Sequence, residues 1–262
     1  MAHAAALQHG DFTALATDYG RYRPGYAKPV LSAVLGLLRR EASSLDAVDV
    51  GAGTGLWTHM LAGVGFRSVT AVEPNAAMRA AGQRDDGGHD IVWRDGTGEA
   101  TGLADGSADL LTMASSFHWV DFDSATAEFR RVLRPGGWFV ALWNPRLVER
   151  NPLLAEIEAE LLRMKPDLRR VSSGRSGITE TLTDRLNQHP GFDDVVTIES
   201  RHVVRQSVEH YLGAWRSVND VRVQLGEVDF GRFLEYVRDR LADADEVEAT
   251  YLSRAWAARR RD

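Results

Sequence analysis

The chain has 262 residues, of which 44% are hydrophobic and 26% charged, with a formal net charge of −6 and no cysteine. This composition suits one globular domain with an insertion, and the negative charge argues against a wide nucleic-acid footprint. The lack of cysteine excludes disulfides, thiolate metal sites and a cysteine nucleophile, and it fits a reducing cytoplasm. We find no signal-peptide pattern and no apolar run of about 18 residues, so we expect a cytoplasmic protein without a membrane span.

An N-terminal helical segment is predicted over residues 1–40. Its centre is an aromatic and basic run, Y-G-R-Y-R-P-G-Y at residues 19–26, followed by a helical pattern in which Pro29 suits the first turn. The tyrosines could simply pack on the edge of a sheet. Alternatively, Tyr19 and Arg23 reach over a ligand and hold its carboxylate, because arginine pairs with carboxylates through two parallel hydrogen bonds.

The most informative stretch is residues 47–58, which read A-V-D-V-G-A-G-T-G-L-W-T. A short apolar run, the glycines Gly51, Gly53 and Gly55, and a helical pattern predict the first strand–turn–helix unit of a doubly wound α/β sheet. Glycine allows the sharp turn and lets a ligand lie against bare main chain. The G-x-G-x-G spacing differs from the G-x-G-x-x-G of dinucleotide sites. It favours another nucleoside cofactor, although an ordinary strand–helix turn is the alternative.

A second strand is predicted over residues 68–73, and it ends in an acid, Glu73. A carboxylate at this strand tip can accept hydrogen bonds from both ribose hydroxyls of a nucleoside. The alternative is a surface glutamate on a loop. Pro74 and Met78 follow at a place where apolar atoms could cover one face of an adenine.

Residues 91–93 predict the third strand, and the small polar loop after it places Thr97 and Gly98 at the edge of the adenine. The fourth strand is predicted over residues 110–113. His118 follows this strand at the carboxyl edge of the sheet, where open α/β sheets bind ligands. Because histidine titrates near neutral pH, His118 is a candidate general base. Packing beneath a cap is the alternative for this residue.

The second half of the chain is predicted to complete one domain that covers residues 1–262. A helix over residues 124–133 and a strand over residues 138–143 precede a cap insertion at residues 145–190. A sixth strand is expected over residues 195–204, and helices are expected over residues 208–218 and 230–241. The last element, over residues 247–257, is expected to be an antiparallel strand, and a helix is the close alternative.

Taken in order, the motifs over residues 19–143 resemble those of class I S-adenosylmethionine (SAM) methyltransferases, in particular the small-molecule branch similar to trans-aconitate methyltransferase. They are Y-G-R-Y-R-P-G-Y, D-V-G-A-G-T-G, V-E-P-N, D-G-T-G-E-A, S-S-F-H-W-V-D and R-V-L-R-P-G-G. The resemblance implies a Rossmann-like sheet of seven strands, six of them parallel and the last antiparallel, with helices on both sides. It also implies SAM as cofactor and S-adenosyl-L-homocysteine (SAH) as product.

The same resemblance implies a set of cofactor contacts. The family's glycine loop maps onto Gly51, Ala52 and Gly53 beside the methionine part of SAM. Its ribose contact maps onto Glu73 and its adenine contacts onto Thr97 and Gly98. Its contact after the fourth strand maps onto Ser115, and its N-terminal arginine maps onto Arg23, with Tyr19 beside it.

The function implied is in-line transfer of a methyl group to a small-molecule acceptor, at oxygen, nitrogen or carbon. A non-catalytic member that binds SAM and a nicotinamide-dependent oxidoreductase are the alternatives. We expect a monomer or homodimer with no metal, nucleic-acid or membrane partner. Trp119, Trp143 and Trp215 could line an aromatic acceptor pocket, and core packing explains them equally well.

Overall fold

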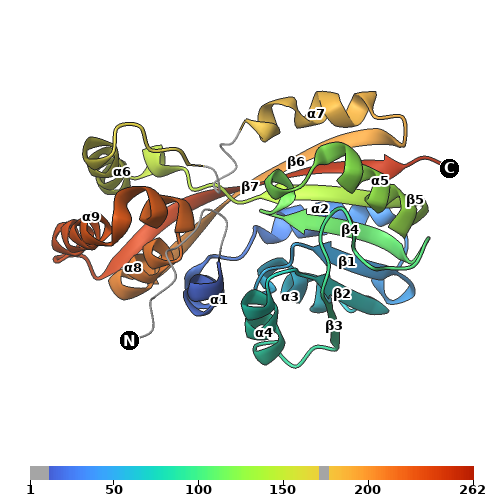
Figure 1. The fold of residues 1–262 in the computed structure, drawn as a ribbon, viewed down its shortest axis with the longest axis horizontal. Helices are drawn as coiled ribbons and strands as arrows, with labels where there is room; N and C mark the ends of the chain where they lie inside the picture. Colours follow the sequence, from blue (N-terminus) through green and yellow to red (C-terminus); the bar gives the residue numbers. More distant parts are fainter. Residues whose placement is uncertain (1–11, 171–176) are drawn as a thin grey trace.

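A computed structural model describes residues 12–170 and 177–262. Its centre is a seven-stranded sheet in the order β3-β2-β1-β4-β5-β7-β6. Neighbouring strands from β3 to β5 are parallel, and β7 runs antiparallel to both β5 and β6. The predicted doubly wound sheet with an antiparallel last strand is therefore confirmed (Figure 1). The strands are β1 (Asp46–Val50), β2 (Ser68–Val72), β3 (Ile91–Arg94), β4 (Ala108–Ala114), β5 (Leu133–Trp143), β6 (Phe192–Ser207) and β7 (Glu246–Arg260).

Helices cover both faces of the sheet and also form a separate group beyond its carboxyl edge. They are α1 (Ala16–Tyr22), α2 (Lys28–Leu38), α3 (Leu56–Ala62), α4 (Ala76–Arg84), α5 (Phe122–Val132), α6 (Pro152–Met164), α7 (Ile178–Gln188), α8 (Val208–Arg216) and α9 (Asn219–Arg240). The helix predicted over residues 230–241 starts earlier than expected. α9 includes residues 219–229 and kinks at Gly226, whose φ is 76°. The helical alternative for residues 247–257 is wrong, because these residues form the middle of β7.

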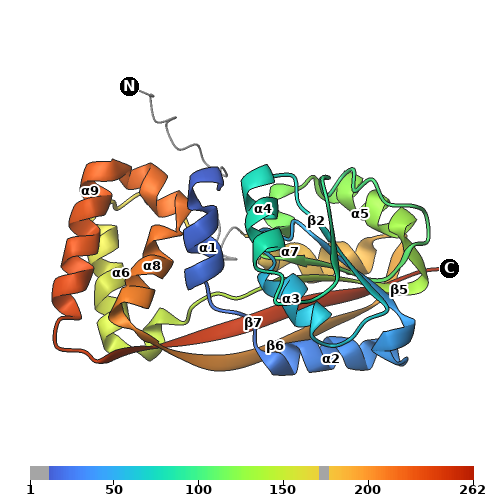
Figure 2. The ribbon, with the colours of Figure 1, turned by 90° about the horizontal axis from the view of Figure 1, so that it is seen from below.

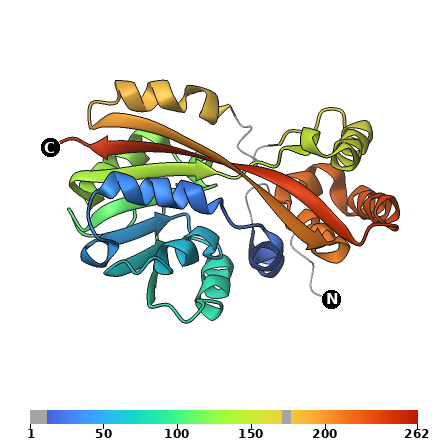
Figure 3. The same ribbon diagram turned by 180° about the vertical axis from the view of Figure 1, so that it is seen from behind.

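Each face of the sheet has its own apolar core. Alternate residues of one strand point to opposite faces, so Phe139 of β5 packs with α5 and α7 while Val140 packs with α2 and α3. Because both faces are covered, the central strands read as continuous apolar runs rather than as alternating ones. Figure 3 shows α2 and α7 on opposite sides of the sheet.

A third apolar core holds α6, α8 and α9 together with the first half of β7. We call these three helices the cap. Figures 1 and 2 show the cap at one end of the molecule, reached by the long antiparallel pair β6 and β7, which continues out of the sheet.

The cap differs in extent from the insertion expected over residues 145–190. Of that range, α6 belongs to the cap, whereas Leu182 and Leu186 of α7 are buried in the core on the sheet. The apolar face of α7 is covered by α5 and the sheet, and α8 and α9 supply the remaining cap core. Residues 171–176 of the expected insertion lie outside the described residues.

The N-terminal segment lies between the cap and the sheet. α1 contacts α8 of the cap on one side and α4 on the other, and Figure 2 shows it between the two bodies. α2 then packs against the sheet through Val30 and Val34. The part of the predicted segment before residue 12 lies outside the described residues. Within residues 12–170 and 177–262, no helix is long and apolar enough to cross a membrane.

Candidate functional site

A cavity of about 560 Å³ lies at the carboxyl ends of β1, β2, β4 and β5, between the sheet and the cap. The residues predicted to bind the cofactor all line it: Tyr19, Arg23, Gly51, Ala52, Gly53, Glu73, Pro74, Met78, Thr97, Gly98 and Ser115. They come from the N-terminal segment and from the ends of four separate strands. The fold therefore brings together residues that are up to 96 positions apart, while His118 is not part of the lining.

The glycine turn after β1 is shaped for close approach of a ligand. Gly51 and Gly53 have φ of 64° and 59°, in the left-handed region that L side chains rarely adopt. A Cβ on Gly51 would lie 2.7 Å from the side chain of Ser116, so this glycine is required by packing. A Cβ on Gly53 would meet only the terminal methyl of Met78, at 3.4 Å, so it would project into the cavity.

The backbone N–H groups of this turn are used inside the protein. Those of Gly51 and Ala52 donate to the carbonyl of Val72 at the end of β2, over 2.8 and 3.1 Å. The N–H of Gly53 donates to Glu73 Oε2 over 2.7 Å. The turn therefore offers a ligand an exposed surface of main chain rather than a set of free donors.

Glu73 is the acid at the tip of β2, and only 7% of its surface is exposed. Its Oε1 accepts from the N–H of Asn75 over 2.9 Å, and its Oε2 accepts from Gly53. Burial raises its pKa above the ordinary value, although the two N–H groups oppose this shift. Each carboxylate oxygen can accept more than one hydrogen bond, so lone pairs remain for a pair of hydroxyls.

Asp49 lies one layer below the turn, fully buried within β1. Its carboxylate accepts from the hydroxyls of Thr58 and Thr112 over 2.6 and 2.8 Å. Burial raises the pKa of Asp49 to about 7, against the effect of these two hydrogen bonds. Asp49 thus ties the first turn of α3 to β1 and β4 and does not reach the cavity.

Tyr26 forms the floor of the cavity beside the end of β4. Its hydroxyl lies 2.8 Å from Ser115 Oγ, and its ring packs edge-to-face on Trp57. Burial holds the pKa of Tyr26 well above its usual range, so the phenol stays neutral. Ser115 has a φ of 55°, a strained value for a residue other than glycine, and such strain is common at functional sites.

Arg23 and Tyr19 lie on the N-terminal side of the cavity. The Arg23 guanidinium stacks on the Tyr19 ring at 5.0 Å and donates from Nε to Ser217 Oγ over 2.8 Å. Its role is therefore partly to join the N-terminal segment to the cap. Phe12 contacts both Tyr19 and Trp119, with ring centroids 5.8 and 6.4 Å apart, and it also lines the cavity.

The predicted adenine side is formed by two short loops. Met78 is buried on α4 beneath Gly53, and Gly98 lies against Val120 so closely that a Cβ there would be 2.5 Å from Cγ1. The Thr97 hydroxyl accepts from the N–H of Ala100 over 3.2 Å, which leaves its own proton free to be donated. Glu99 lines the cavity as well, although the sequence did not single it out.

His118 lies behind the cavity wall instead of in it. Its Nδ1 lies 3.3 Å from the indole Nε1 of Trp143, and its ring packs on Trp119 with centroids 4.7 Å apart. Trp143 and Trp119 themselves line the cavity. In this geometry the histidine supports two aromatic wall residues, and the packing alternative of the sequence analysis describes its surroundings better than the general-base one.

The cap side of the cavity carries a charged and aromatic group that sequence reasoning missed. Arg146, Glu158, Arg170, Trp215 and Tyr251 line it, and of these only Trp215 was noted in the sequence. They come from four separate parts of the chain, so no local motif marks them. The aromatic partners of Arg146 and Arg170 lie far from them in the sequence, so only the fold reveals this group. Among the described residues, no group of three or more histidine or acidic side chains is arranged to hold a metal ion.

Comparison with known proteins agrees with this geometry. Residues 48–141 match the family model described as a methyltransferase domain. An uncharacterized methyltransferase of Mycobacterium tuberculosis is 37% identical over 132 residues, which are 49% of this chain and 49% of that protein. A ubiquinone/menaquinone biosynthesis C-methyltransferase of Rubrivivax gelatinosus is 40% identical over 96 residues, 36% of this chain and 38% of that protein.

The fold has close counterparts among solved structures. A protein provisionally assigned as a type II methyltransferase from Anaeromyxobacter dehalogenans superimposes with a TM-score of 0.64 at 24% identity, over 91% of this chain and 98% of that chain. The chain spans about half the length of the curated relatives it matches. Residues 48–141 are thus similar in sequence to a methyltransferase domain, and the chain shares its overall fold with a solved structure described as a methyltransferase.

Proposed function

We propose that this chain transfers a methyl group from SAM to a small-molecule acceptor held between the sheet and the cap, and releases SAH. The observation that carries the proposal is that a single cavity contains every predicted cofactor contact and continues beyond them to the cap residues. A cavity of this size, with apolar walls and a few convergent polar groups, is typical of small-molecule sites.

The residues present fit SAM. The buried Glu73 carboxylate retains lone pairs for the two ribose hydroxyls, and a Cβ on Gly53 would meet only the terminal methyl of Met78. Pro74 and Met78 offer apolar surface for one face of the adenine. Arg23 and Tyr19 lie at the far end, where a carboxylate would be held. When bound, SAM supplies a methyl group that its positively charged sulfur makes reactive toward nucleophiles.

The protein's own contribution is alignment and exclusion of water. Tyr26, Ser115 and Trp143 surround the place where the glycine turn meets the acceptor side of the cavity. Holding two reactants in line can supply about 7–11 kcal/mol of barrier reduction in favourable models. The neutral Tyr26 phenol can position an acceptor or a water by hydrogen bonding without taking up its proton.

We assign His118 a supporting role for the aromatic wall. A general base has to come within hydrogen-bond reach of the proton it removes, and His118 does not line the cavity but contacts Trp119 and Trp143, which do. An acceptor that is already ionised, such as a carboxylate, would need no base. The catalytic role predicted from the sequence stays a prediction, and the pH profile of a His118 variant tests it.

The proposal is tested in two steps. Calorimetry with SAM and SAH on folded protein comes first, and we expect SAH to bind. A screen with SAM labelled in its methyl group follows, using small acceptors chosen to fit the space beside Arg146. Absence of heat with both SAM and SAH would refute the proposed cofactor, whereas SAH binding without transfer to any acceptor would favour a non-catalytic member of the fold.

A further inference from the structure

Arg146 lines the end of the cavity that lies beneath the cap. We propose that Arg146 binds an oxyanion of the acceptor, and that the acceptor is therefore a small molecule with a carboxylate or a phosphate at one end. The inference rests on the proposed function, because it concerns the second substrate of the same cavity.

The backbone of Arg146 is fixed in place by β7. The N–H of Leu147 donates to the carbonyl of Thr250 over 2.8 Å, and the carbonyl of Pro145 accepts from Leu252 over 2.9 Å. Arg146 itself forms an isolated antiparallel bridge with Tyr251. The residue before these is held too, because Asn144 accepts from Ser253 Oγ over 2.8 Å. The side chain therefore starts from a rigid position, as a binding residue needs.

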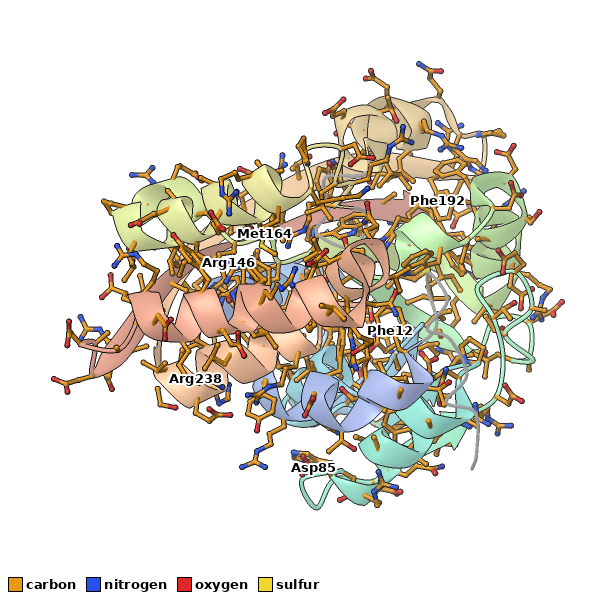
Figure 4. All side chains as sticks on the ribbon, turned by 60° about the vertical axis from the view of Figure 1, so that its left-hand side comes forward. Phe12, Asp85, Arg146, Met164, Phe192 and Arg238 are labelled. Atoms are coloured by element: carbon orange, nitrogen blue, oxygen red, sulfur yellow. The ribbon has the colours of Figure 1, made fainter. Side chains whose placement is uncertain are left out.

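The guanidinium of Arg146 lies beneath the cap and contacts the rings of Tyr211 and Trp215. Its Cζ lies 4.8 Å from the ring centroid of Trp215 and 5.2 Å from that of Tyr211, and only 13% of the side chain is exposed. Figure 4 shows Arg146 among the side chains of the cap helices. The described residues provide one ion pair, to Glu158 at 3.8 Å, and no hydrogen bond to this guanidinium. Burying a charged group without hydrogen bonds is costly, so an arrangement of this kind indicates a ligand.

The one carboxylate that pairs with Arg146 among the described residues is also bound by a second arginine. Both oxygens of Glu158 accept from Arg170 over 2.9 Å, so this carboxylate mainly serves Arg170. Asp220 lies 4.0 Å from Arg170 but is buried outside the cavity lining. Arg146 therefore shares Glu158 with Arg170, and the closer contacts of this carboxylate are those to Arg170.

The shape of the group selects the ligand chemistry. The planar fork of a guanidinium matches the two oxygens of a carboxylate or phosphate, and stacking on Trp215 leaves the edge of the fork available. Trp143 and Tyr251, which also line the cavity, provide apolar surface for the body of the acceptor. The acceptor atom would then lie between these aromatic walls and the glycine turn.

The test uses three small probes on the 262-residue chain saturated with SAH: benzoate, phenyl phosphate and the neutral benzamide. Ligand-observed NMR gives their affinities for the native chain and for Arg146→Gln, Arg146→Lys, Glu158→Gln and, as the matched control, Arg150→Gln, an exposed arginine four positions along. We expect an oxyanion to bind the native chain about tenfold or more tightly than benzamide. Arg146→Gln should abolish this preference, Arg146→Lys should reduce it, and Arg150→Gln should leave it intact.

Glu158→Gln gives a result in the opposite direction. It removes the competing carboxylate, so oxyanion affinity should rise, which a purely structural role of the cluster would not produce. A preference for phenyl phosphate over benzoate would identify the oxyanion as a phosphate, and the reverse would identify a carboxylate.

Binding of SAH to each variant shows that it is folded and keeps this inference separate from the proposed function. Loss of SAH binding in the native chain would refute the function. With SAH bound, the assignment of Arg146 is overturned if benzamide binds as tightly as both anions, or if Arg146→Gln retains their preference.

Discussion

The backbone N–H of Gly53 donates a hydrogen bond of 2.7 Å to Glu73 Oε2. This bond joins the glycine turn after β1 to the acid at the tip of β2, so the two motifs form one unit. The carboxylate is held at a fixed distance from the bare main chain before any ligand arrives. Pre-organisation of this kind lowers the ordering cost of binding.

Changing Glu73→Gln should weaken SAH binding about 10–100-fold. The amide replaces one acceptor oxygen by a donor, so a ribose hydroxyl would be left without an acceptor when SAH binds, at a cost of about 1–3 kcal/mol. Calorimetric titration with SAH measures the loss. Asp95→Asn is the matched control, because Asp95 follows β3, is exposed and does not line the cavity. Equal SAH affinity for Glu73→Gln and the native chain would contradict the ribose assignment.

Alanine at the two glycines of the turn should separate packing from binding. Gly51→Ala would place a Cβ 2.7 Å from Ser116 and should chiefly lower the free energy of unfolding. Gly53→Ala would place its Cβ in the cavity and should chiefly lower SAH affinity. Gly102→Ala controls for backbone strain, since Gly102 has a φ of 69° and nothing within 4 Å of the added carbon. Urea unfolding measures the free energy of unfolding of all three variants, and titration measures their SAH affinity. If Gly51→Ala and Gly53→Ala change both quantities equally, the assignment of one glycine to packing and the other to binding is wrong.

Asp49→Asn should change how stability depends on pH. The pKa of Asp49 is raised to about 7 in the folded protein, so the folded state binds its proton more tightly than the unfolded state does. The free energy of unfolding of the native chain should therefore fall, relative to the variant, as pH rises from about 4 to about 7. Urea unfolding of both proteins across this range measures the difference. A constant difference would mean that Asp49 is ionised in the fold throughout the range.

Asp46→Asn should show the opposite dependence on pH. Arg67, Arg134 and Ser68 donate to this carboxylate at the other end of the sheet and hold its pKa well below the usual range. Its stabilising effect, about 1–2 kcal/mol after allowance for the exposed arginines, should be complete above about pH 4 and be lost as pH falls further. Acid-range urea unfolding of the two proteins tests this. If the variant is equally stable at pH 7, the network contributes nothing.

A change of His118→Asn should leave the shape of the pH–rate profile unaltered for any acceptor found. The histidine supports Trp143 through a bond of 3.3 Å, so its loss should act on acceptor KM more than on kcat. Steady-state kinetics between about pH 6 and 9 separate the two effects. If His118→Asn removes an ionisation near pH 6–7 from the pH profile of kcat, His118 acts as the general base.

The donor side of the site could be predicted from sequence because its determinants are local. Gly51, Gly53 and Glu73 each stand at a strand end, and the order of parallel strands brings strand ends together. Arg146 and Glu158 could not be predicted in this way. They meet only because α6, α8 and β7 form a shared apolar core, and helix patterns do not show which helices will pack together.

The antiparallel strand pair β6–β7 limits how caps could be exchanged between related chains. Val247 and Ala249 of β7 belong to the cap core, whereas Ala255 and Ala257 of the same strand belong to the sheet core. One strand, β7, is therefore part of both the cap core and the sheet core. A one-residue insertion in this strand would turn every following side chain to the opposite face of the sheet. A chimaera that takes its cap from another enzyme would have to preserve the length of β7 and the alternation of its side chains. The junctions of such a chimaera belong in the loops.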